Sequence, residues 1–356
     1  MAERVEWVAD PGRLEELAGP WDALDPGPFG LSGFYRAWWR AFGEGALRVC
    51  VVWRGERLAA ALPLQCTGAT RWSVLANVHT PRLALPFADE DAMSAAWAAA
   101  FSRARELLVP ALPTDGALWR SLAAARERRP RWEIVTPGNL SPVVDTSGEL
   151  DAWRAESKPR WGAPLERFRR KMGRENDAAF TLVHEPDDLE AELDRGIALE
   201  AAGWKGEQGT AMAADGAVER FYREAAGHWH AAGMLRCSAL TLDGGLAAWD
   251  LCALHAGELM LVKTAFDESR RRLAPGLVLR LSVIERCFEG EIAAHDLLGD
   301  DDGWKLKFST GVRPHVQIRS LARGPRAAAA VGYRRGARPL AKRVLRVTRP
   351  VRARAS

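Results

Sequence analysis

The chain of 356 residues contains a repeated sequence order, and this repeat constrains its fold more than any other feature. The groups Phe-Tyr-Arg, Leu-Arg and Leu-Ala-Ala follow one another between Phe34 and Ala60, and they return in the same order between Phe221 and Ala248. The first group recurs 187 positions later, and the other two recur 188 positions later. Self-similarity at a nearly constant offset predicts two copies of one structural unit, for which this length has room.

Each copy reads as a helix followed by a two-stranded hairpin, because Asp243-Gly244 between apolar runs is a hairpin turn signal. The second copy continues with a strand from Glu258 to Ala265, a helix from Pro275 to Phe288, and strands at 292–298 and 313–321. This order predicts an α/β (α+β) fold, in which helices flank a mixed, mostly antiparallel sheet with a parallel crossover inside it.

The first copy carries matching elements beyond its hairpin. We expect strands at 70–78, 82–87, 106–111 and 131–136, and helices at 91–105 and 118–127. Turn signals at Pro137-Gly138 and Ser147-Gly148 indicate a boundary between the copies. We therefore expect an N-terminal domain at residues 1–145 and a C-terminal domain at residues 146–322.

Two segments of the chain are strongly basic. The helical region from Leu150 to Ala178 contains the run Arg167 to Arg174, and Pro159 and Pro164 predict two helices with a break. The tail, residues 323–356, has eleven basic and no acidic residues, so the net charge of +4 leaves about −7 for the remainder. Such a tail favours disorder, or a surface helix on an acidic face or an anionic membrane.

The cysteine pattern and the hydropathy indicate a cytoplasmic protein. Five cysteines lie mostly in apolar runs without CxxC spacing, which is typical of a reducing compartment and argues against structural zinc. The N-terminus has no apolar core of signal-peptide length. No stretch approaches the ~18 apolar residues of a membrane-spanning helix.

Several segments along the chain, taken together in their order and spacing, resemble those of a known family. They are Leu31–Gly43, Phe168–Lys171, Trp204–Gly206, Lys263–Glu268, Leu273–Gly276, Leu298–Asp300, Trp304-Lys305 and Phe308. These segments resemble the CelD-type acyltransferases of the GNAT superfamily, which are related to the FemA/FemX aminoacyltransferases. The resemblance covers about Trp21 to Leu321 and implies tandem GNAT folds in a bacterial cytoplasmic enzyme. It also implies acyl transfer from acetyl-CoA or another acyl-CoA to an amine or hydroxyl, such as that of a sugar or envelope polysaccharide precursor.

The expected donor site lies where a strand joins the helix that starts at Pro275. The GNAT pyrophosphate loop has a Gln or Arg followed by glycines, whereas Arg270–Gly276 keeps the arginines and only the last glycine. A helix start offers unpaired N–H groups to an anion, and guanidinium groups add charge-assisted hydrogen bonds. The candidate cofactor-binding residues are Arg271, Arg272, Leu273, Ala274, Pro275 and Gly276, although three loop arginines also suit a solvated face.

Acyl transfer to an amine requires a polarised thioester, a deprotonated amine and a stabilised thiolate, and it needs no enzyme nucleophile. The candidate catalytic residues, all polar groups near the cleft, are Asp300, Asp296, Lys305 and Lys263. The candidate substrate-binding residues are Trp204, Lys205 and Asp250. The alternatives are a turn carboxylate for Asp300, an ion pair for Lys305 and a packing role for Trp204.

Two other functions compete with acyl-CoA-dependent transfer. The donor could be an aminoacyl-tRNA, or the chain could be a non-catalytic binding subunit in polysaccharide assembly. We expect no other nucleic acid, because the tail has Tyr333 as its lone aromatic residue, and we expect no metal, because Asp300–Asp302 lacks the ligand spacing of a calcium loop. The acidic Asp89–Asp91 predicts that the first copy has no donor site. The acceptor, the acyl group and the oligomeric state are left open.

Overall fold

The computed structural model describes residues 3–203, 206, 208–325 and 327–328, so most of the basic tail lies outside the described residues. The first half contains β1 (Glu3–Val8), α1 (Pro11–Glu16), α2 (Ala18–Asp22), α3 (Ser32–Phe42), β2 (Ala46–Arg54), β3 (Arg57–Gly68), β4 (Arg71–Val74), α4 (Glu90–Arg103), β5 (Glu106–Pro113), α5 (Gly116–Arg128) and β6 (Trp132–Asp145). The second half contains α6 (Leu150–Glu175), β7 (Ala178–His184), α7 (Leu189–Ala202), η1 (Met212–Ala214), α9 (Gly216–Ala231), β8 (Leu235–Leu242), β9 (Gly245–His255), β10 (Glu258–Phe266), η2 (Glu268–Leu273), α10 (Pro275–Glu289), β11 (Ala294–Asp296), α11 (Gly303–Leu306) and β12 (Gly311–Leu321).

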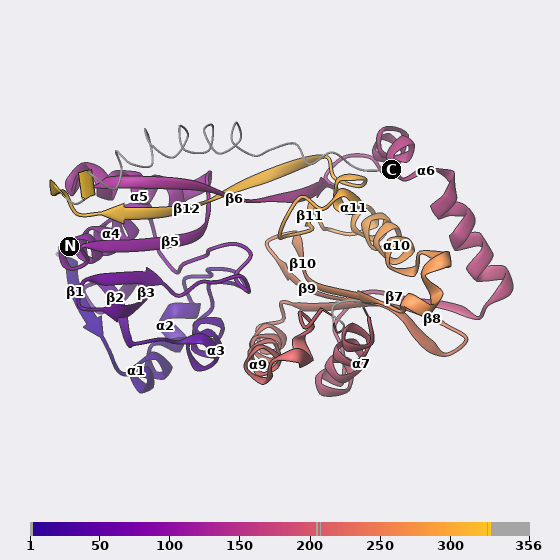
Figure 1. Cartoon of the computed structure of the whole chain (residues 1–356), viewed down its shortest axis with the longest axis horizontal. Helices are drawn as coiled ribbons and strands as arrows, with labels where there is room; N and C mark the ends of the chain where they lie inside the picture. Colours follow the sequence, from indigo (N-terminus) through magenta and orange to yellow (C-terminus); the bar gives the residue numbers. More distant parts are fainter. Residues whose placement is uncertain (1–2, 204–205, 207, 326, 329–356) are drawn as a thin grey trace, which may run out of the picture.

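The strands form one sheet whose order shows the duplication. From one edge the order is β1-β2-β3-β4-β5-β12, and from the other edge it is β7-β8-β9-β10-β11-β6. The neighbours β4 and β5 are parallel, as are β10 and β11, while all other neighbours are antiparallel. Figure 1 shows this mostly antiparallel sheet with helices on its faces, which confirms the predicted fold class.

The last strand of each half lies beside the other half. Strand β12 pairs with β5 through residues 315–321, and β6 pairs with β11 through residues 143–145. The two exchanged strands also pair with each other from Gly311 opposite Val143 to Leu321 opposite Trp132. Strand β6 thus continues through Pro137-Gly138 to Asp145. The division at residues 145 and 146 stays a prediction, because the exchanged strands link the halves.

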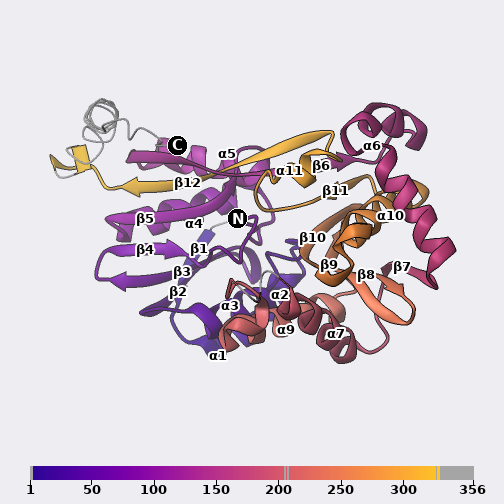
Figure 2. The same cartoon turned by 45° about the vertical axis from the view of Figure 1, so that its right-hand side comes forward.

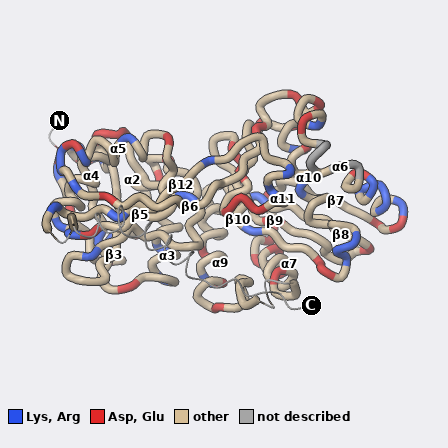
Figure 3. The backbone as a smooth tube through the Cα atoms, turned by 45° about the horizontal axis from the view of Figure 1, so that its top comes forward, with Lys and Arg blue, Asp and Glu red and all other residues tan. Residues whose placement is uncertain are grey.

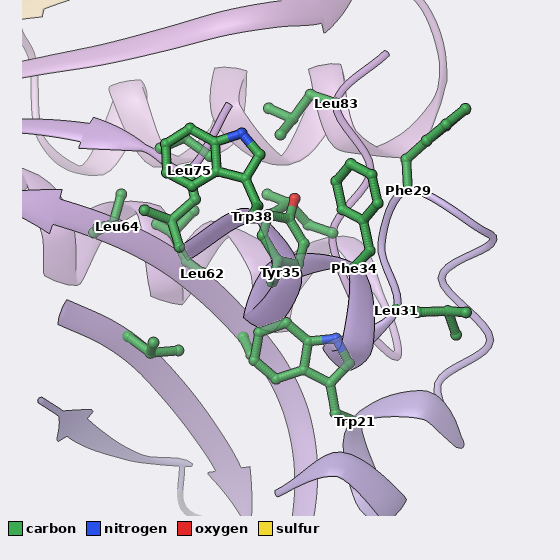
Figure 4. Packing of buried hydrophobic residues seen from close by; sticks show 14 of the residues in the cluster. Trp21, Phe29, Leu31, Phe34, Tyr35, Trp38, Leu62, Leu64, Leu75 and Leu83 are labelled. Carbon is green, nitrogen blue, oxygen red and sulfur yellow. The ribbon is translucent and has the colours of Figure 1, made fainter. Parts of the chain in front are cut away.

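The two copies also contact each other through their equivalent helices. Phe34 of α3 and Phe221 of α9, which are 187 positions apart, lie edge to face with ring centroids 5.5 Å apart. Trp229 stacks on Phe34 at 6.2 Å, and its indole N–H donates to the carbonyl of Pro28 at 2.8 Å. Figure 4 shows Phe34 within the aromatic cluster of the first half. Burying such rings against each other makes the repeated helices part of one core.

Two expectations were wrong in detail. Residues 82–87 form no strand; their backbone joins the sheet through Leu83 N–H to Ala111 at 2.8 Å and the isolated bridge between Ala60 and Phe87. Leu83 and Leu85 alternate along this segment and are buried, so they anchor a loop. Helix α6 is one element of 26 residues that changes direction along its length, as Figure 2 shows, where two helices were expected. A proline removes a helical hydrogen bond, and a bend can accommodate that loss without ending the helix.

The described residues include no helix long and apolar enough to cross a membrane. All five cysteines are free, and Cys66 is the least buried of them.

Gly33 makes the contact between α3 and α9 possible, and its replacement should separate the two helices. A Cβ atom at Gly33 would lie 2.2 Å from the His228 ring, so Gly33→Ala should lower the free energy of unfolding by about 1–3 kcal/mol. Gly227 is the matched control, because a Cβ atom there meets nothing within 4 Å; Gly227→Ala should raise stability by about 0.5–1 kcal/mol. Chemical denaturation measures both, and equal effects of the two substitutions would contradict the proposed packing.

Candidate functional site

A groove of about 350 Å³ opens beside the end of β10. It is lined by residues from five elements and their joining loops: Leu199, Glu200, Gly203, Thr264, Ala265, Phe266, Arg271, Ala274, Gly276, Leu277 and Trp304. Helices α7 and α10 lie on opposite faces of the sheet in Figure 1, and both contribute to the groove. The groove therefore runs past the sheet from one face to the other.

The sheet opens here because its two parallel strands separate. Strands β10 and β11 pair only from Glu258 opposite Ala294 to Met260 opposite Asp296. Strand β10 then continues for six residues to Phe266, with a register shift against β9 between Leu261 and Lys263. A bulge bends a strand and re-aims its side chains, so the far end of β10 is free to line a groove.

The start of α10 presents one unused N–H group, that of Gly276, to this groove. Ala274, the N-cap residue, has a left-handed conformation (φ 51°, ψ 50°) and gives no side-chain capping hydrogen bond. Pro275 occupies the first turn and is buried, while the Gly276 N–H has no acceptor among the described residues. An uncapped helix start with its partial positive charge is suited to an anion.

The equivalent helix of the first half is closed by its own carboxylate. Asp89 is the N-cap of α4 and accepts from the Ala92 N–H at 3.0 Å. It also pairs with the Arg54 guanidinium, and both interactions lower the pKa of Asp89. An anion could reach this helix start only by displacing Asp89.

The arginines before α10 divide into two kinds. Arg271 lines the groove and is exposed, and its guanidinium makes no hydrogen bond or ion pair with the described part of the chain. Arg272 is exposed and equally without such a partner, but it does not line the groove. Arg270 donates to the Leu242 carbonyl at 2.9 Å and pairs with Asp267 at 3.2 Å. Leu273 is half-buried and packs against the hydrophobic core of the second half, which includes Val278 and Leu281 of α10.

Glu200, which the sequence interpretation missed, is a buried carboxylate on the groove wall. Its exposed fraction is 2%, and its Oε2 atom accepts from the Met212 N–H at 2.8 Å. Its Oε1 atom lies 3.7 Å from the Lys263 Nζ, so the predicted residue Lys263 is the cationic neighbour of Glu200. Helix α7 carries several glutamates, and nothing in its sequence distinguishes Glu200 from the others.

Lys263 also contacts an aromatic pair on the same face of the sheet. Its Nζ atom lies 4.4 Å from the centroid of the Tyr222 ring, an arrangement that stabilises the cation. The Tyr222 hydroxyl lies 3.1 Å from the His79 Nδ1. Burial and the nearby Lys263 lower the pKa of His79 to about 4, so this ring is neutral near pH 7. Lys263 thus joins Glu200 to a polar cluster formed by both halves.

The structure does not bring the other three candidate catalytic residues into the groove: Asp296 ends β11, Asp300 lies in the turn that follows, and Lys305 lies in α11. Asp296 is fully buried and accepts from the Leu298 N–H at 2.9 Å and from Arg313 at 3.0 Å. Burial raises the pKa of Asp296. Lys305 donates to the Leu298 carbonyl at 2.9 Å and the Asp300 carbonyl at 3.1 Å. The Asp300 carboxylate is exposed.

Asp250, a candidate substrate-binding residue, lies inside the sheet and helix layer. It pairs with Arg280 of α10 at 2.7 Å, and both side chains are 1% exposed. Arg280 also lies 2.7 Å from the His295 Nε2, and the His295 Nδ1 lies 2.8 Å from the Leu259 carbonyl. Burial and the Arg280 charge lower the pKa of His295 to about 3, so the neutral ring can accept from Arg280 and donate to Leu259.

The other two candidate substrate-binding residues, Trp204 and Lys205, lie outside the described residues.

The described residues include no group of three His, Cys, Asp or Glu side chains that could hold a metal ion.

Comparisons with known proteins agree with this architecture. A family model described as an acetyltransferase (GNAT) domain matches residues 163–306. Three solved structures are similar over most of both chains. The C-terminal domain of a protein assigned as a lysylphosphatidylglycerol synthetase from Agrobacterium fabrum is 14% identical, with 90% of this chain and 96% of that chain covered and a TM-score of 0.54. L-PGS from Bacillus licheniformis is 12% identical (92% of this chain, 96% of that chain, TM-score 0.53), and FemX is 9% identical (90% of this chain, 97% of that chain, TM-score 0.55).

These comparisons show a GNAT fold and leave finer assignments open. The family match lies within the second half and includes the whole groove wall, while the solved structures cover both halves. A comparison with curated proteins found no match. Membership of the CelD-type family stays a prediction.

The buried pair of Asp250 and Arg280 should contribute to stability, and its loss should leave substrate affinity unchanged. Removing one partner of a buried ion pair leaves an uncompensated charge, so Asp250→Asn should lower the free energy of unfolding by about 3 kcal/mol. Glu175→Gln, in the exposed pair with Lys171, is the control and should have no measurable effect. Denaturation curves test this. Unchanged stability of Asp250→Asn together with a raised acceptor KM would instead make Asp250 a substrate-binding residue.

Proposed function

We propose that this chain is an acyltransferase that binds an acyl-CoA in the groove beside β10 and transfers the acyl group to an amine or hydroxyl. The observation that carries the proposal is the uncapped start of α10, which opens into the groove beside an exposed, unpartnered Arg271. The GNAT fold supports acyl transfer as the reaction class. A sugar or an envelope polysaccharide precursor is the proposed acceptor, in line with the resemblance in sequence.

The donor fits this groove through its diphosphate. The Gly276 N–H and the Arg271 guanidinium can bind the phosphates, and a glycine at 276 lets a phosphate approach the backbone. The left-handed Ala274 sets the turn that keeps this helix start open. Ala265 and Phe266 add apolar wall for the rest of the donor. Arg272, outside the groove lining, can contribute to the positive field at its mouth.

Glu200 is the proposed general base on the other face of the sheet. A neutral amine must lose a proton as it attacks the thioester carbonyl, and a buried carboxylate beside the groove can accept that proton. The attack forms the new C–N bond, breaks the C–S bond and releases the CoA thiolate. Lys263 balances the charge of Glu200, while Asp296 and Lys305 act by holding the turn after β11. Asp300, the exposed carboxylate of that turn, stays a proposed catalytic residue.

Acetyl-CoA binding tests the donor assignment. Arg271→Ala removes a charge-assisted hydrogen bond worth about 1.5–3 kcal/mol, so calorimetric titration should show affinity weakened by roughly 10- to 100-fold. Gly276→Asp places a carboxylate in the groove and should abolish binding. Arg270→Ala is the matched control from the same arginine run, because Arg270 is bonded away from the groove. If Arg271→Ala and Gly276→Asp both bind as the natural sequence does, the donor site is elsewhere.

Glu200→Gln tests the base. We expect kcat to fall by about 100-fold or more, with little change in acetyl-CoA affinity, and the acidic limb of the pH profile to disappear. Glu192→Gln is the control, since Glu192 lies on the same helix but accepts from the Trp249 indole at 2.7 Å. A pH profile that keeps its shape in Glu200→Gln would show that another group takes the proton.

Transfer from an aminoacyl-tRNA is the second candidate, and a specific observation favours it. Helix α6 contacts η2 and α10, and Arg169 pairs with Glu285 to hold α6 there. Figure 3 shows basic residues along α6, where Arg167, Arg170, Lys171 and Arg174 are exposed. This basic surface near the groove suits a polyanion larger than CoA.

Thermal unfolding of the full chain with each ligand separates the candidate functions. Protection by acetyl-CoA favours acyl-CoA-dependent transfer, and protection by tRNA alone favours transfer from an aminoacyl-tRNA. Protection by neither favours a non-catalytic binding subunit.

The basic tail stays a proposed contact with an anionic membrane or another polyanion.

A further inference from the structure

A second cavity, of about 500 Å³, lies between the two halves at the position where the first half would have its own groove. The groove beside β10 is lined by Ala274, just before α10, and by Trp304 of α11, while the second cavity is lined by Phe87, in the segment before α4, and by the start of α5. Duplication therefore produced two equivalent openings. The first-half opening cannot use a helix start as a phosphate site in the same way, because Asp89 caps α4.

The second half supplies much of the polar lining of this cavity. His255, Glu258, Arg313 and His315 come from β9, β10 and the exchanged strand β12, and they face Arg82 and the start of α5 from the first half. The strand exchange places β12 beside β5, so it also carries Arg313 and His315 to this cavity. The volume lies within the range of about 300–1,000 Å³ that is typical of small-molecule sites.

His315 is the clearest sign that the cavity binds something. The side chain lines the cavity, its exposed fraction is 2%, and neither ring nitrogen reaches a hydrogen-bond partner among the described residues. The main-chain groups of Arg313 and Asn139 lie close enough to raise the pKa of His315, but burial dominates and lowers it. The neutral ring has one donor and one acceptor to offer, and leaving both unused inside a protein is costly.

Further unused polar groups surround His315. The Arg313 guanidinium uses only Nη1, for Glu258 and Asp296, so its Nη2 and Nε atoms have no partner among the described residues. Asp115 makes no side-chain hydrogen bond or ion pair with the described residues and does not cap α5. Burial and the Arg82 charge lower the pKa of both Arg313 and His315, and the nearby Asp115 carboxylate partly offsets that lowering. The N–H groups of residues 116–118 at the start of this 13-residue helix have no acceptor among the described residues.

The charges of the cavity select a ligand without a net charge. Arg82 and Arg313 are balanced by Glu258, which lines the cavity, and by the buried Asp296. Two further carboxylates line the cavity: Asp25, whose Oδ1 atom lies 2.7 Å from the His255 Nε2, and the exposed Asp115. An anionic ligand would lie against Glu258 and Asp115, and a cationic ligand would lie against the two guanidinium groups. Hydroxyl groups both donate and accept, so they can bond the free donors and the free acceptors together.

We propose that this second cavity binds a neutral polyhydroxylated molecule of mono- to disaccharide size, held by His315, Arg313, Asp115 and the start of α5. The site is separate from the donor groove, and the proposal does not depend on acyl transfer.

Saturation-transfer NMR with the full chain tests this site against a series of sugars that differ in charge. We expect N-acetylglucosamine, which is neutral, to give a signal, and glucosamine and glucuronate to give weaker ones. Ala117→Trp fills the cavity from the start of α5 and should abolish the signal. His315→Phe should reduce affinity by about tenfold, the loss of roughly one hydrogen bond. If His315→Phe does not fold, Asp115→Asn gives a second affinity measurement, because Asp115 is exposed and its substitution should not disturb folding.

Gly276→Asp closes the other groove and distinguishes the two sites. It should leave the N-acetylglucosamine signal unchanged, and loss of that signal in Gly276→Asp but not in Ala117→Trp would place the sugar in the donor groove. Absence of any signal from N-acetylglucosamine would overturn the site, as would a signal that survives Ala117→Trp. A stronger response from glucosamine or glucuronate would overturn the neutral ligand class.

Discussion

The pairing of β6 with β12 is the interaction on which the rest of the structure depends. Each of these strands completes the sheet of the opposite half, so the hydrogen bonds between Gly311–Leu321 and Trp132–Val143 join two repeated units into one sheet. Long antiparallel ladders of this kind leave no inner sheet edge open. The contact between Phe34 and Phe221 then fixes the two helix layers at the same junction.

The two openings in the sheet differ because the same architecture carries different end groups. The helix start at Ala274 has no side-chain cap, whereas the one at Asp89 is closed by a carboxylate that also pairs with Arg54. The exchanged strand adds His315 to the first-half opening, whereas the described lining of the groove beside β10 includes no histidine. Duplication therefore preserved the geometry of an opening while local electrostatics separated the chemistry of its two copies.

Local signals in the sequence predicted the elements well, and contacts between distant residues accounted for what they missed. Asp243 and Gly244 both have positive φ values, as their turn pattern indicates, and Pro275 is in the first turn of α10. The strand exchange could not be read from the sequence, because β12 would show the same alternation beside either half. Asp250 shows the same limit for the site: a carboxylate on an apolar strand suggests a ligand until a buried partner such as Arg280 is seen. Glu200 gave no signal, since its burial depends on the arrangement of α7, η1 and β10.

The exchange of strands also determines when the protein can fold during its synthesis. The first half is translated completely before β12, and until Gly311–Leu321 leaves the ribosome the edge of β5 has no partner. An exposed strand edge can pair with another chain, so the nascent first half is open to association for as long as the second half is being made. Strand β12 completes both cores at once, so its emergence is the moment at which the two repeats become one cooperative unit.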